Sequence, residues 1–148
     1  MKRAIILVAM LALAARPAGA ARGAKLKTFA YGVELHWYLA NLQQASVEQG
    51  LGKPDQISYE WCNSPTGCVD RKDELRSTAM YASWSDHASK TFVWIKLCRH
   101  PIPGELWQVV AVVHAKMGKT DAWGTRTAPE TLYESRDTEN SSACYSGR

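Results

Sequence analysis

The sequence has no apolar run long enough to cross a bilayer. A membrane-spanning helix needs roughly 20 apolar residues, and the longest run here, residues 4–15, is shorter than that. We therefore expect no membrane anchor. An apolar run of this length that follows Lys2 and Arg3, and that leads into small residues ending at Ala20, is typical of a cleaved export signal.

The expected processing divides the chain into two parts. Residues 1–20 form the signal peptide, and residues 21–148 form a single disulfide-bonded domain in the periplasm or outside the cell. Mass spectrometry of the exported protein should find a mature chain that begins near Ala21, because the residues at 18 and 20 are small. An exported chain that still carries Met1 would contradict this processing.

The mature chain lacks an excess of charge of either sign. The whole sequence has 18 basic and 14 acidic residues, a formal net charge of +4. Lys2, Arg3 and Arg16 belong to the expected signal, so 15 basic residues remain against 14 acidic ones, a net charge of +1. This balance gives no electrostatic reason to expect a nucleic acid or an anionic membrane as the partner.

Catalytic signatures are absent as well. The sequence has no Gly-x-Ser-x-Gly, no phosphate-binding loop, no His-Glu-x-x-His and no paired acidic metal motif. Cys62 and Cys68 do not have a usual zinc-ligand spacing, and export favours oxidised cysteine. We therefore expect no metal and no cofactor, and an enzyme is the less favoured class.

The sequence does contain an even set of cysteines. All four, Cys62, Cys68, Cys98 and Cys144, lie in the mature part, which predicts two disulfides with three possible connectivities. We favour Cys62–Cys68 with Cys98–Cys144. The reason is that the Asn-Ser-Pro-Thr-Gly sequence between the first pair is typical of a turn.

The clearest secondary-structure signal is a hairpin over residues 91–117. Two flanks rich in β-branched and aromatic residues enclose Arg-His-Pro-Ile-Pro-Gly, which has the prolines and the glycine of a turn. Residues 107–113 of the second flank would be apolar on both faces of a strand. Such a strand is covered on both faces, so we place it in the middle of a sheet.

Residues 27–49 allow two interpretations. Large apolar residues alternate with small or polar ones from Phe29 to Leu39, and Gly32 would cost a helix about 1 kcal/mol, so a strand is preferred. The alternative is a helix from about Lys27 to Gln49. Beside the preferred strand, residues 41–50 are polar and predict a short helix that stops at Gly50.

Further short strands are expected at residues 56–61, 76–84 and 131–136. Together with the hairpin they predict a mostly β protein, a small antiparallel β sandwich or barrel with one short helix. If residues 27–49 are helical, the fold becomes α+β, with an N-terminal helix packed on a curved antiparallel sheet.

One short motif suggests an enzyme. The sequence Tyr59-Glu60-Trp61 resembles the Tyr-Glu-Trp strand of the secreted guanyl-specific ribonucleases, in which the Glu is the general base. The resemblance implies that Glu60 acts as the base. A carboxylate and an imidazole across a sheet can act as base and acid, so His114 is the candidate acid, with Arg76 or Arg99 holding a phosphate, although His114 lies farther along the chain than in that family. A small secreted hydrolase is therefore the alternative function.

A second resemblance suggests a binding protein. The stretch from Cys62 to Ile95 contains a disulfide-closed loop, then Arg76, then Trp-Ser-Asp leading into a strand. It is similar to the periplasmic inhibitors of vertebrate-type lysozyme, whose loop projects and plugs the enzyme's active site with a histidine. The present loop is one residue longer than in that family and has no histidine.

The loop itself remains the favoured binding site. A short disulfide loop is stiff, so little conformational entropy is lost when it docks. Its candidate binding residues are Asn63, Ser64, Pro65 and Thr66. We therefore expect an exported binding protein of the inhibitor or immunity type, whose partner is a protein or a cell-envelope polymer. The six tryptophans are expected mainly in the core, with one or two free to contact a partner.

Overall fold

The structure is a computed structural model that describes residues 18–64, 67–100, 104–139 and 144. It contains two helices, α1 (Ala18–Gly32) and α2 (Leu39–Glu48). The strands are β1 (Gln56–Ser64), β2 (Gly67–Arg71), β3 (Ala79–Asp86), β4 (Thr91–Cys98), β5 (Gln108–Lys116) and β6 (Glu130–Arg136). They form one antiparallel sheet in the order β2-β1-β3-β4-β5-β6.

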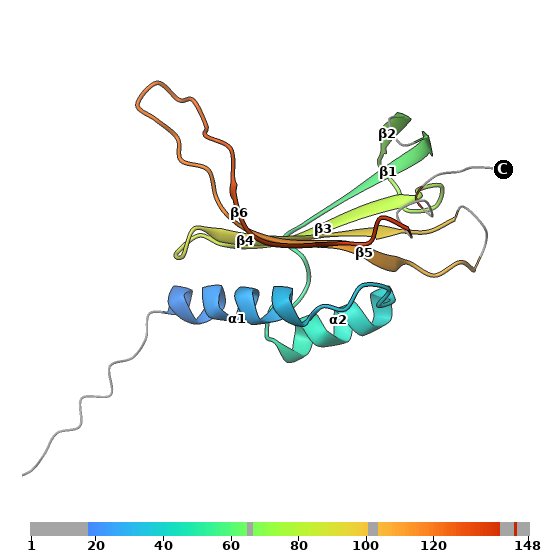
Figure 1. The fold of residues 1–148 in the computed structure, drawn as a ribbon, viewed down its shortest axis with the longest axis horizontal. Coiled ribbons are helices and arrows are strands. Elements are labelled where there is room, and N and C mark those ends of the chain that lie inside the picture. Colours follow the sequence, from blue (N-terminus) through green and yellow to red (C-terminus); the bar gives the residue numbers. More distant parts are fainter. Residues whose placement is uncertain (1–17, 65–66, 101–103, 140–143, 145–148) are drawn as a thin grey trace, which may run out of the picture.

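The molecule has two layers. Both helices lie on one face of the sheet, and no helix among the described residues covers the other face (Figure 1). The β1–β2 hairpin and the β5–β6 hairpin lie toward opposite ends of the sheet, and both project away from the helices (Figure 1). The mostly β, antiparallel prediction is confirmed. Of the two arrangements that the sequence left open, the structure has the helix-on-sheet one.

The core lies between the helices and strands β3, β4 and β5. Alternate residues of β3 and β4 point toward the helices because side chains alternate across a sheet, whereas in β5 a register shift opposite Lys96 and Leu97 interrupts this alternation. The buried residues of this layer include Met80, Trp84, Val93, Ile95, Leu97, Val109 and Val112. β5 is paired on both edges, and Val109–Ala115 are buried in succession, so the prediction of an interior strand covered on both faces is confirmed.

The preferred strand over residues 29–39 is wrong. α1 continues to Gly32, and a turn follows before α2. The buried residues Leu26, Phe29, Ala30 and Val33 follow the 3–4 spacing of a helix whose apolar stripe faces a core. The alternation that favoured a strand was coincidental, because Tyr31 is 53% exposed.

The second helix is close to its predicted position. The expected span was 41–50, and α2 occupies Leu39–Glu48. Gly50 follows the helix with a φ of 70°, a left-handed conformation that glycine adopts without penalty. Two helices therefore precede the sheet, where one short helix was expected. No helix of the described part of the chain is long and apolar enough to cross a membrane.

Both predicted disulfides are present. Cys62 is bonded to Cys68, and Cys98 to Cys144. Cys62 and Cys68 face each other in the register of the β1–β2 hairpin. This hairpin was not expected, because the charged residues after Val69 indicated a loop. β2 is an edge strand, and its exposed side chains carry no apolar pattern by which a strand could be recognised.

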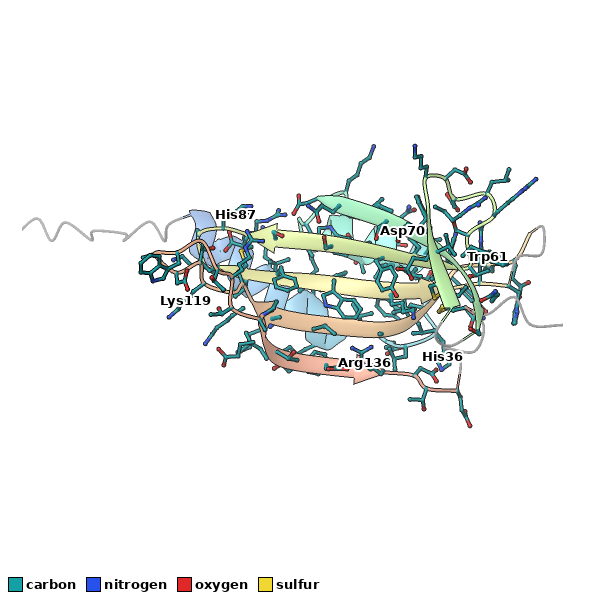
Figure 2. All side chains as sticks on the ribbon, turned by 90° about the horizontal axis from the view of Figure 1, so that it is seen from above. His36, Trp61, Asp70, His87, Lys119 and Arg136 are labelled. Carbon is teal, nitrogen blue, oxygen red and sulfur yellow. A yellow bond between two sulfur atoms is a disulfide. The ribbon has the colours of Figure 1, made fainter. Side chains whose placement is uncertain are left out.

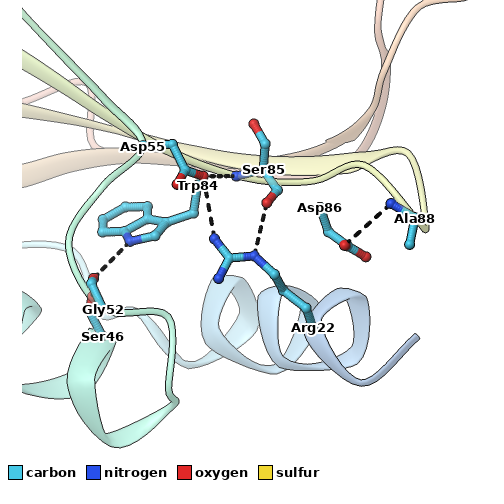
Figure 3. A network of polar contacts seen from close by, with 8 residues as sticks. All are labelled: Arg22, Ser46, Gly52, Asp55, Trp84, Ser85, Asp86 and Ala88. Atoms are coloured by element: carbon cyan, nitrogen blue, oxygen red, sulfur yellow. Dashed lines mark hydrogen bonds and ion pairs between the residues drawn. The ribbon is translucent and has the colours of Figure 1, made fainter. Parts of the chain in front are cut away.

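The N-terminal end of α1 is fastened to the sheet by polar contacts (Figure 3). Arg22 Nε donates to Ser85 O at 2.9 Å, and Arg22 Nη2 lies 3.3 Å from Asp55 Oδ2. The same Asp55 oxygen accepts the Ser85 amide at 2.7 Å. A Cβ at Gly23 would lie 2.6 Å from Ser89 Oγ, so a glycine is needed for this close approach.

Candidate functional site: the uncovered face of the sheet

The face opposite the helices carries large polar and aromatic side chains. On β3 and β4 every second side chain points into the core. The side chains between them, which include Tyr81, Trp94 and Lys96, lie on the uncovered face. Arg136 of β6 joins them, because Lys96 and Arg136 both pair with Ala111, from opposite sides of β5. Figure 2 views the sheet from this side, with Arg136 labelled.

These four residues, here called the aromatic–basic cluster, contact one another. The rings of Tyr81 and Trp94 lie 6.0 Å apart between centroids. Lys96 Nζ lies 5.6 Å from the Tyr81 ring centroid, and Arg136 Cζ lies 5.5 Å from that of Trp94. Such contacts between cations and aromatic rings hold long side chains in place before any partner arrives.

An open hollow adjoins the cluster. Its volume is about 760 Å³. Tyr81 and Trp94 line it together with the apolar residues Ile57 and Ala82 and with five polar ones: Asp55, Gln56, Ser58, Glu60 and Ser83. The hollow therefore offers two aromatic rings beside hydroxyl, amide and carboxylate groups.

The charge of Lys96 depends on this environment. Burial lowers the pKa of Lys96 below its ordinary value; the Glu60 carboxylate opposes this shift and Arg136 adds to it. The ammonium group thus has less water around it than a surface lysine has. A carboxylate or carbonyl oxygen from a partner would stabilise it.

The predicted binding loop lies at the end of the β1–β2 hairpin. Asn63 is exposed and Ser64 is half-buried, while Pro65 and Thr66 lie outside the described residues. The loop end is tight, since a Cβ at Gly67 would lie 2.4 Å from Asn63 Oδ1. Trp61, labelled in Figure 2, is half-buried in the same hairpin.

The proposed catalytic pair is not brought together. Glu60 pairs with Ala79, which lies with Cys98 on the uncovered side. His114 pairs with Val93 of the core and is therefore on the helix side. Arg76 is an exposed residue of the β2–β3 loop. An acid and a base on opposite faces of a sheet cannot act on one bond, so the pairing is wrong.

His114 has another environment of interest. Its side chain is only 4% exposed, and neither ring nitrogen has a hydrogen-bond partner among the described residues. Burial lowers the pKa of His114, and Lys27 of α1 lowers it further. The imidazole is therefore held neutral between α1 and the sheet.

One group of potential metal ligands exists in the described part of the chain. The ligand atoms of Glu60, Cys62 and Cys68 lie within 4.8 Å of one another. The two sulfurs are bonded to each other, so neither can act as a thiolate ligand, and Glu60 alone remains. This group does not fit a metal centre.

The aromatic–basic cluster was not identified from the sequence, although one signal was available. In Phe-Val-Trp-Ile-Lys-Leu the aliphatic residues occupy one face, while Lys96 occupies the face of Trp94. A lysine in that position indicates that its face is not part of the core. Comparisons with protein-family models, curated proteins and solved structures find no match. The site is therefore interpreted from its own geometry.

Proposed function

We propose that this is an exported binding protein of the inhibitor or immunity type that holds another folded protein against the uncovered face of its sheet. One observation carries the proposal. Its own helices cover one face, while the opposite face bears the aromatic–basic cluster between two projecting hairpins (Figure 1).

The composition of that face favours a protein partner. Tyrosine, tryptophan and arginine are the residues enriched at the energetic centres of protein interfaces. In this face they are Tyr81, Trp94 and Arg136, and their mutual contacts reduce the side-chain entropy lost on binding. The adjoining hollow is wide and open, as suits a protruding segment of a partner.

Binding is also favoured over hydrolysis. The hydrolase alternative needed Glu60 and His114 in one cleft, and they lie on opposite faces. The uncovered face also has charged residues that can form ion pairs with a partner: Lys96, Arg136, Glu60 and Glu134. Arg136 already pairs with Glu134, so the rim of this face is electrostatically mixed.

The proposal is tested by replacing Trp94. Capture from periplasmic extract would first identify the partner, and its affinity and activity would then be measured with purified proteins. Trp94→Ala should weaken binding at least tenfold, about 1.4 kcal/mol, because it removes a large ring from the centre of the face. Wild-type protein at saturation should suppress the partner's activity.

Trp37→Ala is the matched control. Trp37 lies on the helix side and donates to Glu34 at 3.0 Å, so its loss should leave binding within twofold. Arg136→Ala, an exposed change, gives a second test if Trp94→Ala folds poorly. Full affinity in both Trp94→Ala and Arg136→Ala would refute the docking face.

The disulfide loop gives a separate prediction. Changing Asn63, Ser64 and Thr66 together to Ala should shift stability by less than about 0.5 kcal/mol, since Asn63 is exposed at the hairpin end. If the loop contacts the partner as one wall of the binding face, the same triple variant should bind at least tenfold more weakly. Unaltered binding by this variant would confine the interface to the sheet.

A further inference from the structure

A second hollow lies at the other end of the molecule, between the β3–β4 turn and the base of the β5–β6 hairpin. Its volume is about 610 Å³. We call it the basic pocket, because its lining includes His87, Lys90, Lys116 and Lys119 together with the hydroxyl residues Ser89 and Thr120. Figure 2 shows His87 and Lys119 at the same end of the molecule.

Among the residues that the structure describes, no carboxylate lines the basic pocket. Glu130 pairs with Lys116 at 3.5 Å, whereas Lys90 and Lys119 have no ion-pair partner among the described residues. Asp86 is buried and accepts the amides of Ser89 and Ala88. Positive charge is therefore concentrated at the basic pocket, although the net charge of the mature chain is close to zero.

The pocket is held in shape by the backbone. The Met117 amide donates to Lys90 O at 2.8 Å, which joins the two segments that form the walls. Across the hairpin, the Thr127 amide donates to Lys119 O and the Lys119 amide to Thr127 Oγ1, both at 2.8 Å. A Cβ at Gly118 would lie 1.9 Å from Thr127 O, so a glycine is required for this close pairing.

The tip of the same hairpin presents a tryptophan. Trp123 is 92% exposed, although tryptophan is usually well buried. Its backbone is nevertheless ordered, because Asp121 Oδ1 accepts the amides of Trp123 and Thr125 at 2.9 and 2.8 Å. Tryptophan is the residue that favours the boundary between water and lipid, with its ring in the apolar layer and its N–H toward water.

We propose that the basic pocket binds the phosphate group of an anionic phospholipid, with Trp123 entering the headgroup layer beside it. Lysine ammonium groups bind phosphate through charge-assisted hydrogen bonds, and basic residues near a membrane surface are attracted to anionic lipids. The attachment is peripheral and reversible. It is independent of the docking face proposed above, because no residue of the aromatic–basic cluster lines the pocket.

Cosedimentation with vesicles tests the proposal. The mature protein should bind phosphatidylglycerol vesicles at 0.1 M salt, should bind phosphatidylcholine vesicles at least tenfold more weakly, and should be released at high salt. Lys90→Ala with Lys119→Ala should reduce the binding constant for phosphatidylglycerol at least tenfold, and Trp123→Ala should do so separately.

Lys25→Ala with Lys72→Ala is the matched control, since it removes two exposed lysines from other parts of the surface and gives the same net charge. Equal losses in the two double variants would overturn the pocket, because they would show only a general charge effect. Absence of binding to phosphatidylglycerol would overturn the proposal. Inorganic phosphate that shifts the amide resonances of residues 87–90 without any vesicle binding would overturn the lipid assignment.

Discussion

Removing the Cys98–Cys144 disulfide should lower the free energy of unfolding by about 4 kcal/mol, whereas removing Cys62–Cys68 should lower it by about 2 kcal/mol. The difference arises because the first bond joins residues 46 apart in sequence and the second joins residues 6 apart. In the chain-entropy treatment, the longer the closed loop, the more the bond restricts the unfolded chain.

Packing acts in the same direction. Cys98 and Cys144 are both fully buried, in a cluster with Ala79 and Val110 on the uncovered side of the sheet. Replacing both sulfurs by hydrogen therefore also removes apolar contacts. In the other bond only Cys62 is buried, in the same cluster, whereas Cys68 is exposed on an edge strand.

Denaturant unfolding at pH 7 provides the measurement. Cys98→Ala/Cys144→Ala is compared with Cys62→Ala/Cys68→Ala, so each variant loses two sulfurs and one bond. The midpoint should fall further in the first variant than in the second. A larger loss in the Cys62–Cys68 variant would show that loop closure does not determine the order.

The parts of the fold that could be predicted are those with local signals. The 91–117 hairpin and the strand over 131–136 have two-residue periodicity or turn residues, and both appear as β4, β5 and β6. The first helix could not be predicted in the same way. From Phe29 onward the pattern alternates like a strand, and only the burial of Leu26, Phe29 and Ala30 in the core decides for a helix.

The candidate site is harder to predict because it depends on register. Lys96 can be assigned to the uncovered face from its own strand. The position of Arg136 beside Lys96 depends on the pairing of both β4 and β6 with β5, and the β4–β5 register shifts between Lys96 and Leu97. Neither that shift nor the gathering of His87, Lys90 and Lys119 in one pocket can be derived from sequence spacing.

His114 leads to the second prediction, a loss of stability in mild acid. The side chain is buried on the helix side of β5, opposite Val93 of β4 and Tyr133 of β6. Tyr133 stacks on Tyr31 of α1, with ring centroids 4.2 Å apart, and closes that side of the core. A charged imidazolium in this position would lack both water and a hydrogen-bond partner among the described residues.

The sign follows from the pKa of His114, which burial and Lys27 hold below the ordinary value of 6.5. Well above pH 6.5 the imidazole is neutral in the folded and the unfolded chain, so it does not change stability. As the pH falls below 6.5, the unfolded chain takes up a proton that the folded protein does not. The free energy of unfolding should then fall by up to about 1.4 kcal/mol per pH unit until the folded-state pKa is reached.

Comparison of wild type with His114→Leu between pH 7.5 and 5 isolates this effect. Leucine has a similar size and cannot be protonated, so the stability difference between the two proteins should change with pH only below about 6.5. If His114→Leu does not fold, the His114 ring resonances of wild type still decide the matter. A titration midpoint at or above 6.5 for those resonances would contradict a neutral, buried imidazole. It would also contradict the predicted loss of stability in mild acid.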